Sequence, residues 1–165
     1  MHSPTRLIHL DLDGVLADFR KGFVAKTGLV PEECSTDEMW SRIAAVQKFF
    51  LQLDVTADGL RLFAFAQMLG EVRILTATPR RTTHPTAEVE KRQWAAIHFG
   101  DVPVTVVQYA RQKADQARPG DILIDDSPEN IRRWNAAGGL GIVHTGFDNT
   151  VEEANRLLAD IGEKS

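Results

Sequence analysis

Four aspartates in two short motifs are the residues of this sequence best suited to chemistry. Asp11 and Asp13 are separated by one residue, and Asp125 and Asp126 are adjacent. Carboxylates that are brought together repel one another, which disfavours their charged forms. A divalent cation relieves this repulsion, and a mostly carboxylate ligand set suits Mg²⁺, which keeps waters and shares its coordination with a phosphate. The two motifs therefore predict a magnesium site for a phosphorylated ligand, provided that the fold brings them together.

Thr76 and Lys113 could complete a site for phosphoryl transfer. Lys113 and Mg²⁺ together can neutralise phosphoryl oxygens, and the Thr76 hydroxyl can donate a hydrogen bond to them. One carboxylate can take the phosphoryl group and form an aspartyl-phosphate. A second carboxylate can protonate the leaving oxygen and later deprotonate water. A turn, a helix entry, a strand end or a solvated lysine would explain each feature alone, so it is their combination that favours an enzyme.

The elements that must position these residues follow an alternating pattern. Short apolar runs at 7–10, 72–75, 104–107, 122–124 and 141–144 are separated by helical patterns. This alternation predicts an α/β fold, with a Rossmann-like parallel sheet covered on both faces. Ligands of such sheets bind at the carboxyl ends of the strands. The four aspartates, Thr76 and Lys113 are expected at that edge, with Thr76 closing the second strand and Lys113 on a helical stretch.

The first two predicted strands are separated by far more residues than one crossover needs. Residues from approximately 17 to 70 are expected to form a small helical cap inserted above the sheet. Within them, Ser35 and Glu38 have the spacing of a capping box, followed by a helical pattern from Met39 to Phe50. Thr56 is predicted to cap a helix that ends at Gly70. Ser127 and Pro128 mark the start of a later helix.

Composition limits the remaining classes of protein. The chain has 165 residues, a net charge of −4 and the single cysteine Cys34. It is expected to form one domain over 1–165, with no disulfide within the chain. The acidic balance argues against a basic track for a nucleic-acid polymer. Neither a signal peptide nor a membrane-spanning run is evident, so we expect a cytoplasmic protein that binds no membrane.

Four segments resemble the motifs of the haloacid-dehalogenase-like (HAD) hydrolases. Residues 11–19 are similar to the first motif, 74–77 to the second, Lys113 to the third and 124–130 to the fourth. Within that superfamily, the run 14–19, the Ile-Asp-Asp-x-x-x-Asn form of the fourth motif and the short helical cap resemble the 5′(3′)-deoxyribonucleotidase branch. Residues 49–51 and 134–139 look like those of its small bacterial and phage members.

The resemblance implies a role for each matched residue. Asp11 would be the nucleophile, and Asp13 the general acid and base that also lends its backbone carbonyl to Mg²⁺. Thr76 and Lys113 would hold the phosphate. Asp126 would be the direct metal ligand of the last pair, whereas Asp125 would position a water on the ion.

The chain departs from the eukaryotic members of that branch at two places. They carry an arginine directly after the aspartate pair, where this sequence has Ser127, and Ser-Pro after the threonine, where it has Ala77, Thr78 and Pro79. Both positions lie near phosphate or substrate in that branch, so its preference for base and sugar does not carry over directly. Arg80 and Arg81 are candidates for the missing positive charge, with solvation as the alternative.

Aromatic residues of the predicted cap are candidates for choosing the leaving group. A nucleobase can stack on aromatic rings, and Phe19, Trp40 and Phe49 are the candidates for a pocket wall, with packing inside the cap as the alternative. Phe23 and Phe50 are expected to be core residues. Ala77 and Arg80 are the further candidates for contact with substrate.

The sequence as a whole favours a Mg²⁺-dependent phosphomonoesterase, a 5′-(deoxy)nucleotidase that acts on nucleoside monophosphates. The alternatives are a HAD-type phosphatase of a sugar phosphate or another small phosphoester, and a catalytically silent, cation-binding interaction domain. A receiver-type signalling domain is disfavoured because Gln108 and Tyr109, not an aspartate, follow the third strand. A nucleotide kinase is disfavoured because the sequence contains no Gly-x-x-x-x-Gly-Lys loop. Whether the chain forms a homodimer that helps to cover the site stays open.

Overall fold

The computed structural model describes residues 6–79 and 82–162, and its centre is a parallel sheet of five strands in the order β3-β2-β1-β4-β5. This arrangement confirms the predicted α/β class. Residues such as Leu10, Ile74 and Ile124 are fully buried, as expected for a parallel sheet that is covered on both faces. The strands are β1 (Leu7–Leu10), β2 (Glu71–Ala77), β3 (Val104–Val107), β4 (Ile122–Asp125) and β5 (Leu140–Val143).

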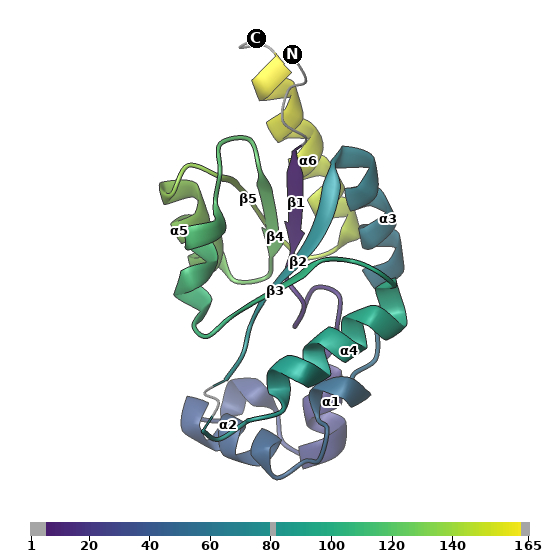
Figure 1. Ribbon diagram of the computed structural model, residues 1–165, viewed down its shortest axis with the longest axis vertical. Coiled ribbons are helices and arrows are strands. Elements are labelled where there is room, and N and C mark those ends of the chain that lie inside the picture. The colour runs from purple at the N-terminus through teal and green to yellow at the C-terminus, as the bar shows by residue number, and fades with distance from the viewer. Residues whose placement is uncertain (1–5, 80–81, 163–165) are drawn as a thin grey trace.

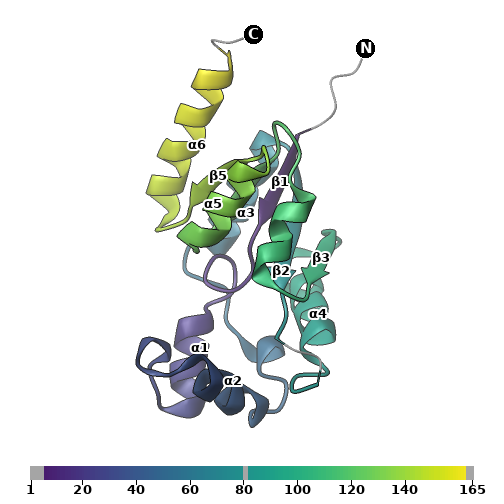
Figure 2. The same cartoon turned by 90° about the vertical axis from the view of Figure 1, so that its left-hand side faces the viewer.

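Helices cover both faces of the sheet and one of its ends (Figure 1). Helix α3 packs against β1 and β2, and α6 packs against β5 and α3. Helix α5 contacts β4 and β5 from the other face, as Figure 2 shows. The α-helices are α1 (Phe19–Thr27), α2 (Thr36–Ala44), α3 (Gly59–Leu69), α4 (Ala87–Phe99), α5 (Pro128–Ala136) and α6 (Phe147–Gly162), and 3₁₀ helices span Pro31–Glu33, Phe50–Gln52 and Ala110–Gln116.

The register of the sheet aligns the residues of the predicted site. Leu10 pairs with Ile74 on one side and with Ile124 on the other. The next residue, Asp11, extends the pairing, because its backbone N–H donates to the carbonyl of Ile124 at 2.9 Å. The carboxyl ends of β1, β2 and β4 are therefore level with one another, as the parallel topology predicts.

One sequence expectation at this edge needs adjustment, and another is confirmed. Thr76 lies inside β2 rather than at its end, because the ladder with β3 continues to the pair Ala77–Val107. Lys113 lies on a helical stretch as expected, but this stretch is the 3₁₀ helix Ala110–Gln116.

The helix signals between β1 and β2 are confirmed in part. Ser35 accepts a hydrogen bond from the Glu38 backbone and starts α2, but α2 ends at Ala44, so the predicted pattern to Phe50 is not one helix. Thr56 is not the cap of α3, because that helix begins at Gly59 and the Thr56 hydroxyl donates to the carbonyl of Val15. The hydroxyl thus ties residue 56 to the loop that follows β1. Gly70 ends α3 as predicted.

Helices α1 and α2 lie beyond the carboxyl ends of the strands, whereas α3 packs on the sheet (Figures 1 and 2). Helix α4 reaches both regions, because it contacts β3 and the 3₁₀ helix Phe50–Gln52. The Trp94 indole donates to the carbonyl of Leu53 at 2.7 Å and fastens the two together. We call residues 19–53 the cap helices; the insertion over approximately 17–70 as a unit stays a prediction.

None of the helices within residues 6–79 and 82–162 combines the length and the apolar character needed to span a membrane.

Candidate active site

Asp11 stands at the carboxyl end of β1 and is buried. Its Oδ1 lies 2.7 Å from the Nζ atom of Lys113. Burial raises the pKa of Asp11 to about 7, because the loss of water around the carboxylate outweighs the attraction of Lys113. The nearby carboxylates of Asp125 and Asp13 act in the same direction as burial. A positive charge placed here would therefore be strongly stabilised.

Lys113 joins the two buried aspartates. Its ammonium donates to Asp11 and to Oδ2 of Asp125, at 2.7 Å in each case. Burial alone lowers the pKa of Lys113, but the two carboxylates outweigh it and raise that pKa above its usual value. Lys113 thus stays charged and holds both carboxylates in place.

Asp125 is already engaged at both carboxylate oxygens. Besides Lys113, the Ser127 backbone N–H donates to Oδ1 at 2.8 Å. The Asn130 side chain donates to both oxygens at 3.2 and 3.1 Å. Ser127 begins α5, so the start of this helix positions Asp125. Asn130 was part of the fourth motif, but its role became visible only with the folded helix.

Asp126 is the exposed member of the pair and lies against Gly14. A Cβ atom at Gly14 would come within 2.2 Å of Asp126 Oδ2, and the backbone there has a φ of +82°, so only glycine fits this loop. Desolvation, followed by repulsion from Asp125, raises the pKa of Asp126 to about 6. The loop after β1 and the end of β4 are therefore built to bring carboxylates together.

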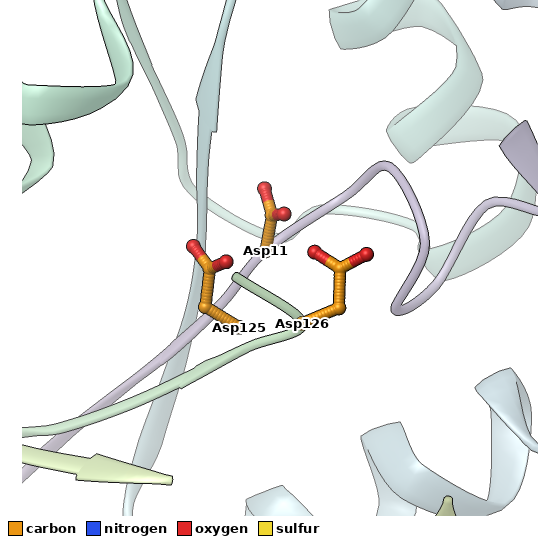
Figure 3. Close-up of side chains that lie close together, drawn as sticks. All are labelled: Asp11, Asp125 and Asp126. Carbon is orange, nitrogen blue, oxygen red and sulfur yellow. The ribbon is translucent and has the colours of Figure 1, made fainter. Parts of the chain in front are cut away.

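Asp11, Asp125 and Asp126 can present oxygen atoms that all lie within 4.8 Å of one another. Figure 3 shows their side chains gathered between the end of β1 and the end of β4. Oxygen donors in a carboxylate-rich cluster fit a hard divalent cation such as Mg²⁺. The raised pKa values of Asp11 and Asp126 point the same way, since they record unrelieved repulsion and desolvation.

Asp13 meets a second lysine, which the sequence analysis missed. The fully buried Lys91 of α4 lies 2.5 Å from Oδ2 of Asp13. The same ammonium donates to Thr76 Oγ1 at 3.2 Å and to the carbonyl of Ala77 at 2.7 Å. A signal did exist in the sequence, because Lys91 shares a helical face with the buried residues Ala87, Trp94 and Ala95.

The candidate substrate residues are placed in different ways. Phe19 and Phe49 meet edge to face with ring centroids 5.7 Å apart. Trp40 lies half-buried against His84. Ala77 lies in the site and offers its carbonyl to Lys91. Arg80, like Arg81, lies outside the described residues.

A cavity of about 490 Å³ lies between the cap helices and α4. Phe49 and Phe50 line it from the cap, and Glu90 lines it from α4. Phe50, which was expected to be a core residue, is indeed buried, yet it also forms part of this wall. The aspartates of the site are not among the lining residues. The Phe50 ring lies between the two regions, since its centroid is 4.7 Å from Lys91 Nζ.

The sequence matches one model of a known protein family. Residues 5–158 match the model described as 5′ nucleotidase, deoxy (pyrimidine), cytosolic type C protein. That match covers nearly the whole chain. No curated protein matches the sequence at a significant level.

Solved structures resemble the fold at low sequence identity. A hydrolase from Streptococcus pneumoniae TIGR4 is 15% identical with a TM-score of 0.53, and the match covers 93% of this chain and 100% of the other. A haloacid dehalogenase-like family hydrolase from Streptococcus pneumoniae is 15% identical with a TM-score of 0.54, covering 90% of each chain. The magnesium-bound HAD-hydrolase YfnB of Bacillus subtilis is 13% identical with a TM-score of 0.52, covering 84% and 86%.

Proposed function

Because this chain belongs to the 5′ nucleotidase, deoxy (pyrimidine), cytosolic type C family, and so is a phosphoric monoester hydrolase of the HAD type, we propose that it releases phosphate from nucleoside monophosphates through an aspartyl-phosphate on Asp11. One observation carries the mechanism. Asp11 lies in the cluster suited to a cation, whereas Asp13, two residues on, lies outside that cluster and pairs with a different lysine. Two carboxylates in two environments suit two different chemical roles.

The residues of the site fit a bound Mg²⁺, which would neutralise the phosphoryl oxygens and so favour attack on phosphorus. Asp11 and Asp126 would hold the ion together with the backbone carbonyl of Asp13. Asp125 would support the site without binding the ion directly, because Lys113, Ser127 and Asn130 already donate hydrogen bonds to its oxygens. The magnesium in YfnB, which shares this fold, is consistent with the assignment.

The chain's own residues carry the two chemical steps. An Asp11 oxygen forms a bond to phosphorus while the bond to the leaving oxygen breaks, and Asp13 gives that oxygen a proton. Asp13 then takes a proton from a water whose oxygen attacks phosphorus. The bond from phosphorus to Asp11 breaks, and inorganic phosphate leaves. Lys113 and the Thr76 hydroxyl would hold the phosphoryl oxygens through both steps.

A nucleoside as the leaving group is supported by the family and by the cavity between the cap helices and α4. Its lining includes the buried residue Phe49, on whose ring a base could stack where binding uncovers it. Phe19, which touches Phe49, and Trp40 would extend this wall. Ala77 would lie near the phosphate. We place the enzyme in the cytoplasm, with a small metabolite as its substrate.

The test is phosphate release from deoxy- and ribonucleoside monophosphates and from several sugar phosphates, with Mg²⁺ or with EDTA. Asp11→Asn should lower turnover at least about a thousandfold while the protein keeps its fold by circular dichroism. Asp160→Asn, an exposed aspartate on α6, serves as the matched control. Substantial turnover in Asp11→Asn would contradict the nucleophile assignment. Magnesium-dependent release from sugar phosphates alone would keep the chemistry and replace the substrate.

A further inference from the structure

Lys91 is a fully buried lysine that the proposed mechanism does not use. It lies on α4, and its ammonium reaches Thr76 and Ala77 of β2. Its ammonium has three acceptors, which are Oδ2 of Asp13, Oγ1 of Thr76 and the carbonyl of Ala77. An ammonium has three donors and no acceptor, so these partners account for its full hydrogen-bonding capacity. A buried lysine with this set of partners is held in one place.

The contact leaves the two oxygens of Asp13 in different states. Oδ2 accepts from Lys91. Oδ1 is shielded from water and has no hydrogen-bond partner in the described part of the chain. A buried acceptor without a partner is costly, so a feature of this kind calls for an explanation. A proton donor or acceptor supplied by the reaction would satisfy Oδ1.

The element that carries Lys91 is also attached to the wall of the cap. The neighbouring Glu90 accepts from the Phe50 backbone N–H at 3.1 Å and from the Thr86 hydroxyl at 2.6 Å. Lys91 itself lies over the Phe50 ring. Consecutive residues of α4 therefore fix the cap wall and the Asp13 carboxylate relative to each other.

We propose that Lys91 is a positioning residue, which holds Asp13 by Oδ2 so that Oδ1 faces the leaving oxygen of the substrate. This inference rests on the proposed function. In the first step the proton on Oδ1 passes to the leaving oxygen as its bond to phosphorus breaks, and in the second step Oδ1 receives a proton from the attacking water. Lys91 gives up no proton in either step and acts on the proton transfers through Asp13. Its hydrogen bond to Thr76 Oγ1 is a separate contact, on which the inhibition constant of inorganic phosphate reports.

Leaving-group dependence tests this role directly. A nucleoside alkoxide needs protonation far more than p-nitrophenolate does. Lys91→Met should therefore lower kcat/KM, which reports on formation of the aspartyl-phosphate, by about tenfold to a hundredfold for a nucleoside monophosphate, with a clearly smaller loss for p-nitrophenyl phosphate. KM, the inhibition constant of inorganic phosphate and the affinity for Mg²⁺ by calorimetry should stay unchanged. Lys21→Met, an exposed lysine of α1, is the matched control.

A double-mutant cycle with Asp13→Asn separates positioning from general damage. If Lys91 acts through Asp13, Lys91→Met should lower kcat/KM no further in the Asp13→Asn background. Additive losses, or equal losses for both substrates, would overturn the proposal. A weaker inhibition by inorganic phosphate would instead show that Lys91 acts on the phosphate site, either directly or through Thr76. If Lys91→Met does not fold, Lys91→Arg keeps the charge and should retain nucleotide turnover above that of Lys91→Gln.

These outcomes are distinct from those that test the proposed function. An active wild-type enzyme with an additive cycle would overturn the role of Lys91 alone. A wild-type protein that releases no phosphate from any substrate would overturn the nucleotidase proposal and the role of Lys91 with it.

Discussion

Two buried lysines meet the aspartates of this site from two different helices, Lys113 from the 3₁₀ helix Ala110–Gln116 and Lys91 from α4. On the sheet side, Lys113 bridges Asp11 and Asp125, both of them buried. On the cap side, Lys91 pairs with the single carboxylate of Asp13, whose side chain is 24% exposed. We call the contacts of Lys113 with Asp11 and Asp125 the sheet-side contacts, and the contact of Lys91 with Asp13 the cap-side contact. They use the same residue type, but they differ in how completely the lysine balances the negative charge.

The difference in charge indicates a difference in task. On the sheet side, ionised Asp11, Asp125 and Asp126 would face the single ammonium of Lys113 and leave two negative charges unbalanced, which one Mg²⁺ would neutralise. On the cap side, one ammonium matches one carboxylate, and the remaining polar partners are neutral. The sheet side is therefore suited to holding a cation and a phosphoryl group. The cap side is suited to orienting a group that exchanges protons.

The largest expected effect comes from removing Lys113. In Lys113→Met, the buried carboxylates of Asp11 and Asp125 lose their ammonium, which should cost about 3–5 kcal/mol of unfolding free energy in EDTA. Lys91→Met should cost clearly less, because it leaves one part-exposed carboxylate without an ammonium rather than two buried ones. Urea unfolding of both variants at pH 8 measures the difference. An equal or larger loss in Lys91→Met would remove the distinction between the two sides.

A smaller effect is expected from pH in the metal-free protein. The folded pKa of Asp11 is raised from 3.8 to about 7, and that of Asp126 to about 6. A raised carboxyl pKa contributes stability that is fully present below about pH 3.8 and is lost as the pH rises through the folded value. Between pH 5 and pH 8, Tm in EDTA should therefore fall by roughly 5 °C.

Magnesium provides the control for that pH dependence. Carboxylate ligands bind a metal in their deprotonated form, so the ion should raise Tm more at pH 8 than at pH 5. Asp126→Asn should reduce the loss of stability in EDTA between pH 5 and pH 7. A gain in Tm from Mg²⁺ that is as large at pH 5 as at pH 8 would contradict the raised pKa values.

The sheet side could be predicted from the sequence because its residues follow short strands in recognisable patterns. Asp11 and Asp125 close or follow apolar runs, and parallel topology places such ends at one edge. The spacing and residue types alone were thus enough to bring Asp11, Asp125 and Asp126 together. Lys113 followed from the need for a positive charge beside the phosphoryl group, and the resemblance to known motifs gave it the same role.

The cap side could not be predicted in the same way, because its residues meet through tertiary packing. Lys91 is 78 residues from Asp13 in sequence, and the sequence Glu90-Lys91 resembles an ordinary exposed helix surface. Only its helical spacing from Ala87 and Trp94 marked Lys91 as buried. The short 3₁₀ helix Phe50–Gln52 also escaped prediction, because Phe50 continues the helical pattern begun at Met39 although α2 ends before it.

The smallest effect concerns the wall that the cap presents to the leaving group. Phe49→Leu keeps an apolar side chain of similar size and removes the aromatic face, so it should raise KM for a nucleoside monophosphate by about threefold to tenfold. KM for p-nitrophenyl phosphate should hardly change, because the smaller ester would reach the carboxylates without filling the cavity lined by Phe49. Trp40→Ala should follow the same pattern with a smaller rise, since Trp40 packs against His84. Equal changes in KM for both substrates would mean that these rings only pack the cap. Residues closer to Lys91 and Asp13 would then select the leaving group.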